Sequence, residues 1–306
     1  MRLVTYSHHS GPPTAGALVE RDGADHVVDV SSFAVGPGVA LNGLLDAGAD
    51  GLRGARAAVG EAARGDRAAV PLDEVELLAP IPRPRKLLAA AANYQAHITE
   101  AGLPEVDRSR IVPKLFLKPS TAVLPPGAAL KLPTISREVD WELELGVVIG
   151  RRVRDVPVKA ALGVVAGYTI VNDVSARTLD WGLADREPND WNGFFDWLNG
   201  KWLDGFAPMG PWLVTADEVP DPGALAIELR VNGTVRQSGS TAEMIFGVSE
   251  LVSFASRLMT LEPGDVIATG TPAGVGATTG DRLRGGDVME GTITGLGTLV
   301  TPVTAP

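Results

Sequence analysis

The chain contains no cysteine among its 306 residues. This absence excludes disulfide bonds, thiolate nucleophiles and sulfur-ligated zinc sites. Histidine is also scarce, and three of the four histidines lie near the N-terminus, at His8, His9 and His26. A histidine that acts as a base in the rest of the chain must therefore be His97.

Positive charge is in short supply as well. The 27 Lys and Arg residues are outnumbered by 37 Asp and Glu residues, so the formal net charge is -10. This balance argues against nucleic acid or an anionic membrane surface as the main partner. The most apolar stretch, residues 160–171, is too short to cross a bilayer. We therefore expect a cytoplasmic protein with no nucleic-acid or membrane partner.

Several common catalytic motifs are absent too. The chain has no G-x-S-x-G, no H-E-x-x-H and no G-x-x-x-x-G-K-[ST], and Gly274-Val-Gly276 does not have the spacing of a dinucleotide-binding loop. These absences argue against a serine hydrolase of the nucleophile-elbow type, a zinc protease of the helical-motif type, a phosphate-loop enzyme and a nicotinamide-dependent oxidoreductase.

Short apolar segments separated by Gly, Pro and Asp predict a β-rich beginning of the chain. Residues 41–69, rich in Ala, Arg and Gly, predict one or two short helices. The proline-rich segment 79–85 disfavours both helix and central strand, so we place a domain boundary there. The chain is predicted to comprise a small N-terminal domain, 1–78, and a main domain, 79–306.

The main domain is expected to contain more strand than helix. Buried strands are predicted at 87–92 and 163–174, a hairpin with an Asn-Gly turn at 225–237, and an amphipathic helix around 251–258. Short strands separated by glycine turns follow. The predicted fold class is α+β, predominantly β.

An acidic segment, 138–150, has the alternation of a half-buried strand. Apolar residues occupy its odd positions, whereas Glu138, Asp140, Glu142 and Glu144 occupy even positions and share one face. Residues two apart on a strand are separated by roughly 6.5–7 Å, so adjacent carboxylates need a proton or a cation to offset their repulsion. Taken alone, the alternation is more typical of a solvated strand face than of a functional site.

The predicted strand 163–174 ends at Asp173, which adds a third carboxylate to Glu142 and Glu144. Three carboxylates without sulfur suit Mg²⁺, Mn²⁺ or Ca²⁺, and they leave positions through which a 2-oxo acid or 1,3-dicarbonyl could chelate the ion. His97 and Glu100 are three apart on a predicted helical turn and could activate water. By itself, His97 is more typical of a histidine on the surface of a helix.

Several motifs in order resemble the fumarylacetoacetate hydrolase family, in its shorter bacterial-type form, over about residues 87–303. They are Asn93-Tyr-Gln-Ala-His-Ile-Thr-Glu100, Phe116-Leu-Lys-Pro119, Asp140-Trp-Glu-Leu-Glu-Leu145, Gly167-Tyr-Thr-Ile-Val-Asn-Asp-Val-Ser-Ala-Arg177, Gly200-Lys201 with Asp204 and Phe206, Met209-Gly-Pro211, and the segment Pro263 to Gly276. The resemblance implies a mixed β-roll catalytic domain, a homodimer, and Mg²⁺ or Mn²⁺ held by Glu142, Glu144 and Asp173.

The resemblance also implies roles for the remaining candidates. His97 and Glu100 would lie on a lid and activate water, while Lys201 would stabilise the developing enolate or oxyanion. Thr271 and neighbouring backbone amides would hold the substrate carboxylate. Lys118 and Arg177 are lesser substrate-binding candidates that could equally form structural salt bridges.

The reaction expected from these groups is metal-dependent hydrolysis of a C–C bond in a 2,4-dioxo acid of the acylpyruvate or fumarylpyruvate type. Two alternatives remain open. The same site could decarboxylate oxaloacetate, or isomerise or dehydrate a related oxo acid. The chain could also be a catalytically silent dimer that binds a metal or ligand.

The sequence departs from the family pattern around Lys201. Many relatives carry serine after this lysine, whereas Trp202 follows it here, at the end of the tryptophan-rich segment 180–202. We hypothesise that Trp191, Trp197 or Trp202 lines the substrate pocket or the dimer edge. Ordinary subunit packing is the alternative.

Overall fold

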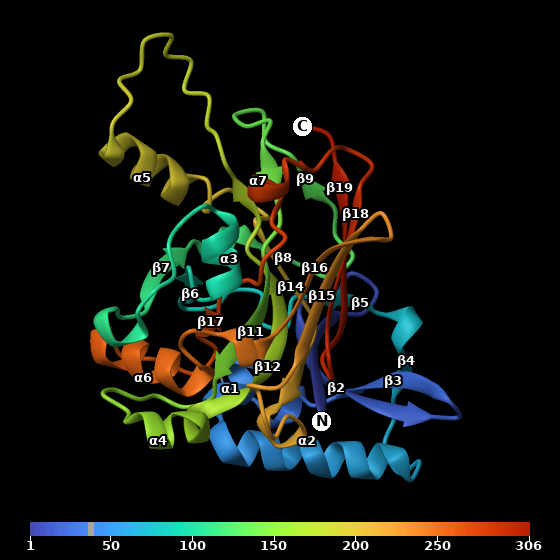
Figure 1. Ribbon diagram of the computed structural model, residues 1–306. Helices are drawn as coiled ribbons and strands as arrows, with labels where there is room; N and C mark the ends of the chain where they lie inside the picture. The colour runs from blue at the N-terminus through green and yellow to red at the C-terminus, as the bar shows by residue number, and fades with distance from the viewer. Residues whose placement is uncertain (36–39) are drawn as a thin grey trace.

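The computed structural model describes residues 1–35 and 40–306, and a large sheet runs through the middle of the molecule (Figure 1). Ten of its strands are hydrogen-bonded in the order β4-β3-β2-β1-β14-β12-β11-β17-β6-β7, with β5 pairing β1 and β8 pairing β14. The strands are β1 (Arg2–Ser7), β2 (Thr14–Arg21), β3 (Ala24–Asp29), β4 (Val70–Pro71), β5 (Glu76–Leu78), β6 (Leu87–Ala91), β7 (Lys114–Lys118), β8 (Val123–Leu124), β11 (Leu143–Ile149), β12 (Val165–Asn172), β14 (Ala207–Thr215) and β17 (Val266–Ala268).

Two smaller sheets complete the β structure within the described ranges. One has the order β16-β15-β18-β19-β9, and the other pairs β10 with β13. Their strands are β9 (Leu130–Lys131), β10 (Val139–Asp140), β13 (Ser175–Ala176), β15 (Ala226–Val231), β16 (Thr234–Ser240), β18 (Val288–Ile293) and β19 (Gly297–Thr304). The α-helices are α1 (Leu41–Asp46), α2 (Gly48–Ala63), α3 (Gln95–Glu100), α4 (Val158–Ala161), α5 (Asp190–Asn199), α6 (Val248–Leu258) and α7 (Gly276–Thr279).

This arrangement confirms the predicted α+β class with an excess of strand. The hairpin of β15 and β16 turns at Asn232 and Gly233, which have φ of 52° and 74°, as the Asn-Gly pair predicts. The N-terminal strands continue the large sheet because β1 pairs with β14 of the main part. The division into 1–78 and 79–306 stays a prediction. None of the helices in the described residues has the length and apolarity needed to span a membrane.

Strand β11 lies inside the large sheet and is buried on both faces. Its odd residues, such as Leu145 and Val147, belong to a core shared with Leu229 of the five-stranded sheet, whereas Val148 belongs to the core that contains Leu44 of α1. All seven residues of β11 are buried. The prediction of a half-buried strand was therefore wrong, because periodicity shows that a strand has two faces but not what covers the second one. The alternative of a solvated face is excluded for Glu142 and Glu144, which are both buried.

The predicted continuous strand 138–150 is also interrupted, between β10 and β11. At the interruption, the amide of Glu142 donates to the side-chain Oδ1 of Asn172 at 2.9 Å, and its carbonyl accepts from the amide of Asp173 at 2.8 Å. These two hydrogen bonds take the place of the regular backbone hydrogen bonds between neighbouring strands. The interruption places Glu142 beside Asp173, at the end of β12.

We expect Leu229→Ala to lower the free energy of unfolding by about 2–5 kcal/mol, because it empties part of a fully buried core. Urea titration followed by circular dichroism measures the change. Leu258→Ala on α6, where the leucine is 55% exposed, is the matched control and should cost far less. Equal costs for the two variants would contradict the assignment of Leu229 to the core between the sheets.

Candidate metal and catalytic site

Glu142, Glu144 and Asp173 form a buried acidic triad, in which each offers one oxygen and these oxygens lie within 4.8 Å of one another. Two neighbouring strands bring them together. The antiparallel pairing of Leu143 with Asn172 aligns the beginning of β11 with the end of β12. The carboxylates of the residues next to this pair therefore meet.

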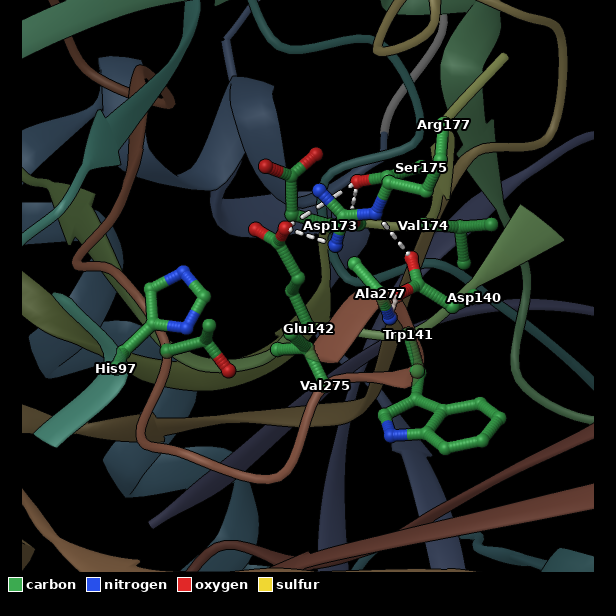
Figure 2. A network of polar contacts seen from close by, with 12 residues as sticks. His97, Asp140, Trp141, Glu142, Asp173, Val174, Ser175, Arg177, Val275 and Ala277 are labelled. Carbon is green, nitrogen blue, oxygen red and sulfur yellow. Dashed lines mark hydrogen bonds and ion pairs between the residues drawn. The ribbon is translucent and has the colours of Figure 1, made fainter. Parts of the chain in front are cut away.

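Three cationic side chains surround the triad. Lys201 Nζ donates to Glu142 Oε2 and to Asp173 Oδ2, each at 2.8 Å. Lys118 Nζ donates to the other oxygen of Asp173. Arg177 bridges two acids, with its Nε 2.7 Å from Asp140 Oδ1 and its Nη2 2.5 Å from Glu142 Oε1, as Figure 2 shows.

Glu142 and Glu144 respond differently to this environment. Burial tends to raise the pKa of Glu142, but the charges of Lys201 and Arg177, with a smaller effect of His97, outweigh burial and lower it below its ordinary value. Burial raises the pKa of Glu144 well above its ordinary value, and the charges of Asp173 and Glu142 raise it further. The contrast arises because Glu144 has no ion-pair partner in the described part of the chain.

Burial also disfavours the charged forms of Lys118 and Lys201. Burial lowers the pKa of Lys118, and the nearby charge of Asp173 offsets this only in part. For Lys201 burial acts in the same direction, but Asp173 and Glu142 together outweigh it, so its pKa is raised. Lys201 therefore keeps its ammonium form at the centre of the site.

The triad fits a hard divalent cation. It supplies only carboxylate oxygens, which Mg²⁺ and Mn²⁺ prefer. Glu144 is 1% exposed, and among the described residues its carboxylate accepts one hydrogen bond, from the backbone amide of Gly270 to Oε2 at 2.7 Å. A buried carboxylate without a balancing cation is costly unless a proton or a metal ion neutralises it.

His97 and Glu100 form a hydrogen-bonded pair on α3, as their spacing predicts. The distance between His97 Nδ1 and Glu100 Oε1 is 2.8 Å. An ionised carboxylate only accepts hydrogen bonds, so Nδ1 carries the proton in the neutral ring and Nε2 is the basic nitrogen. Figure 2 shows the His97 ring beside Glu142 of the triad.

Thr271 is buried beside the triad but its hydroxyl already has protein partners. The hydroxyl donates to the carbonyl of Leu143 at 2.9 Å and accepts from Gln237 Nε2 at 2.7 Å. Gln237 also accepts from the amide of Leu143, so it supports the beginning of β11. Sequence reasoning missed Gln237, because it lies 94 residues from Leu143 and no local pattern marks it.

Asp140, two positions before Glu142 in the acidic segment, is a further residue of the site. Its side chain is fully buried and pairs with Arg177. Burial raises the pKa of Asp140, and the charge of Arg177 opposes that rise without cancelling it. Asp140 thus orients Arg177, which in turn contacts Glu142.

The tryptophans of segment 180–202 lie in different surroundings. Trp197 packs edge-on against Phe116, with ring centroids 5.0 Å apart, and both rings lie within 6 Å of Lys201 Nζ. It also lines a cavity of about 360 Å³ together with Lys201 and Arg177. Trp202 donates its indole N–H to the carbonyl of Leu117, and Trp191 is 72% exposed.

Known proteins resemble this chain over most or all of its length. The family model "Fumarylacetoacetate (FAA) hydrolase C-terminal" matches residues 86–304. A mitochondrial oxaloacetate tautomerase of Xenopus laevis is 35% identical over 308 residues, which covers 99% of this chain and 90% of the relative.

Solved structures of related enzymes share the fold across the chain. A maleylpyruvate hydrolase from Sphingobium, in complex with manganese(II) and pyruvate, matches with a TM-score of 0.75 and 30% identity, covering 100% of this chain and 99% of that one. A 5-carboxymethyl-2-hydroxymuconate delta-isomerase from Mycobacterium smegmatis matches with a TM-score of 0.74 and 32% identity, covering 100% of both chains. With the family model matched over most of the sequence, the chain belongs to the fumarylacetoacetate hydrolase family.

Proposed function

We propose that the protein is a metal-dependent hydrolase that cleaves a C–C bond in a 2,4-dioxo acid of the acylpyruvate or fumarylpyruvate type. The observation that carries the proposal is the His97–Glu100 pair, whose His97 ring lies beside Glu142 of the buried carboxylate triad (Figure 2). A pair of this kind activates water, which hydrolysis requires. The related Sphingobium hydrolase, whose structure contains manganese(II) and pyruvate, supports a pyruvoyl-type substrate.

Glu142, Glu144 and Asp173 would hold Mg²⁺ or Mn²⁺, with Ca²⁺ as an alternative. When bound, the ion would supply Lewis-acid polarisation of the substrate's oxo group. The buried setting strengthens this effect because water is largely excluded. The charges of Lys118, Lys201 and Arg177 keep the acidic cluster from repelling an anionic substrate.

The side chains divide the remaining work. His97 Nε2 takes a proton from water, while Glu100 holds Nδ1 and stabilises the imidazolium that forms. The hydroxide adds to the distal carbonyl, and the C–C bond breaks to give a carboxylic acid and the enolate of pyruvate. Lys201 stabilises the negative oxygen of this enolate, and the proton taken up by His97 returns to the enolate carbon. The backbone amides next to Thr271 would bind the substrate carboxylate. The Thr271 hydroxyl would join them only by giving up its hydrogen bond to the carbonyl of Leu143, and Lys118 and Arg177 would be lesser contributors.

A second candidate is tautomerisation of oxaloacetate or another reaction of an oxo acid, such as decarboxylation, isomerisation or dehydration. The similarity to the Xenopus tautomerase over 99% of the chain supports this candidate. His97 could then move a proton between carbon and oxygen without activating water. A silent metal- or ligand-binding dimer is the remaining alternative, and the retained triad, histidine and lysine speak against it.

We further propose that the enzyme is a homodimer that acts in the cytoplasm. Helix α5 projects from the body of the molecule (Figure 1) and exposes Trp191, Phe194 and Phe195 by 72%, 51% and 47%. Exposed aromatic clusters are enriched in protein interfaces. A second copy of the chain would cover them.

A panel of 2-oxo and 2,4-dioxo acids with Mg²⁺ and Mn²⁺ separates the candidates. We expect acylpyruvates to yield pyruvate, detected by coupling to lactate dehydrogenase, faster than oxaloacetate is tautomerised or decarboxylated. Tautomerisation alone, followed by the ultraviolet absorbance of the enol, would replace hydrolysis with the second candidate. No turnover of any member would leave the silent binding dimer.

Glu142→Gln should weaken Mn²⁺ binding at least tenfold and abolish turnover, because it removes a charged metal ligand. His97→Ala should retain Mn²⁺ binding, measured by isothermal titration calorimetry, while turnover falls by about 10²–10⁴-fold. Glu138→Gln, at a carboxylate outside the triad, is the control and should bind Mn²⁺ normally. Full activity in the presence of a chelator would refute the metal-dependent scheme.

Alanine substitutions test whether the tryptophans line the substrate pocket or the dimer edge. Trp197→Ala should reduce turnover, because Trp197 lines the cavity next to Lys201. Trp191→Ala should shift the dimer toward monomer in size-exclusion chromatography with light scattering. Leu183→Ala, at a leucine that is 66% exposed in the same segment, is the control. Unchanged turnover and unchanged size in both tryptophan variants would leave neither hypothesis standing.

A further inference from the structure

Glu100 has partners far away in the sequence in addition to His97. Its Oε2 accepts from the amide of Gly274 at 2.8 Å and from the hydroxyl of Thr278 at 2.9 Å. These donors are 174 and 178 residues away along the chain. One oxygen of Glu100 thus holds His97, and the other is held by the segment that contains α7.

The segment 274–278 is also bound to the acidic strand region. The carbonyl of Gly274 accepts from Trp141 Nε1 at 3.0 Å, and the amide of Ala277 donates to Asp140 Oδ2 at 2.6 Å. Trp141 and Asp140 directly precede Glu142 of the triad. The segment therefore contacts the His97–Glu100 pair on one side and the metal-site strand on the other.

Glycine is required at position 274 for this double contact. Its φ is +103°, and a Cβ there would lie 2.0 Å from the carbonyl oxygen of Arg236. The backbone amide donor to Glu100 is consequently fixed by close packing. The second donor, the hydroxyl of Thr278, belongs to a side chain and can be removed by substitution.

We propose that Thr278 is a positioning residue, which fixes Glu100 and through it the orientation and tautomer of His97. The inference rests on the proposed function of this pair. The Thr278 hydroxyl also lies 3.0 Å from the carbonyl of Val275, but it has one hydrogen, and the ionised carboxylate is the stronger acceptor.

The Thr278 hydroxyl matters because the His97–Glu100 pair is partly exposed to water. The His97 and Glu100 side chains are 19% and 18% exposed, so water can compete for the carboxylate. Without the hydroxyl, Oε2 keeps one donor among the described residues, the Gly274 amide. Glu100 then turns toward water part of the time, and His97 loses the acceptor that holds its proton on Nδ1.

The kinetic test compares Thr278→Val with Thr278→Ser, using 2,4-dioxopentanoate, the simplest acylpyruvate, with Mn²⁺. We expect kcat of Thr278→Val to fall about tenfold with KM nearly unchanged, as for the loss of one hydrogen bond to a charged group. Thr278→Ser keeps the hydroxyl and should restore kcat. Thr279→Val is the matched control, because the Thr279 hydroxyl contacts Val275 and Asp281 but not Glu100.

An activity-independent readout separates this inference from the proposed function. Amide hydrogen exchange of residues 94–103, measured by mass spectrometry, should be faster in Thr278→Val than in wild type, Thr278→Ser or Thr279→Val. In a Glu100→Ala background, Thr278→Val should cause no additional change. If wild type does not turn over the probe, the exchange results alone decide the inference.

Three results would overturn the positioning role of Thr278. The first is exchange in Thr278→Val that equals that of wild type. The second is a Thr278→Ser variant as impaired as Thr278→Val, which would show that packing and not the hydroxyl matters. The third is an additive effect in the Glu100→Ala background, which would show that Thr278 acts without Glu100.

Discussion

The balance of charge in the buried centre is the constraint on which the rest of the structure depends. Four carboxylates and three cationic side chains meet where β11 and β12 align, and ion pairs connect all of them except Glu144. Burying unpaired charge is expensive, so the surrounding sheets can close over the site only if these partners remain in place. Glu144 is the carboxylate without a cationic partner, and we propose that a divalent ion would bind there.

The scaffold carries more than one chemistry among related proteins. Enzymes described as a hydrolase, an isomerase and a tautomerase share it across nearly the whole chain. In our proposal, a metal ion held by the carboxylate triad would polarise an oxo group, which could assist each of these reactions. We infer that the group that moves the proton would then decide the reaction, so the orientation of His97 would matter as much as its presence.

The sequence predicted those parts of the site that local patterns encode. The spacing of His97 and Glu100 predicted their contact, and the alternation around Glu142 and Glu144 predicted that they share a face. The remaining candidate residues were identified from the family motifs. Their roles remain predictions until the variants are measured.

Other parts of the site could not be predicted because their causes are not local. The second buried face of β11 depends on α1 and α2, which lie about a hundred residues earlier in the chain. Gln237 and Thr278 meet their partners only after the chain has folded back over 94 and 178 residues.

The most direct test of the proposed metal site is anomalous X-ray diffraction from crystals of the wild-type protein soaked with Mn²⁺. The account predicts one peak that contacts an oxygen of each of Glu142, Glu144 and Asp173, and a triad without such a peak at saturating Mn²⁺ would contradict it.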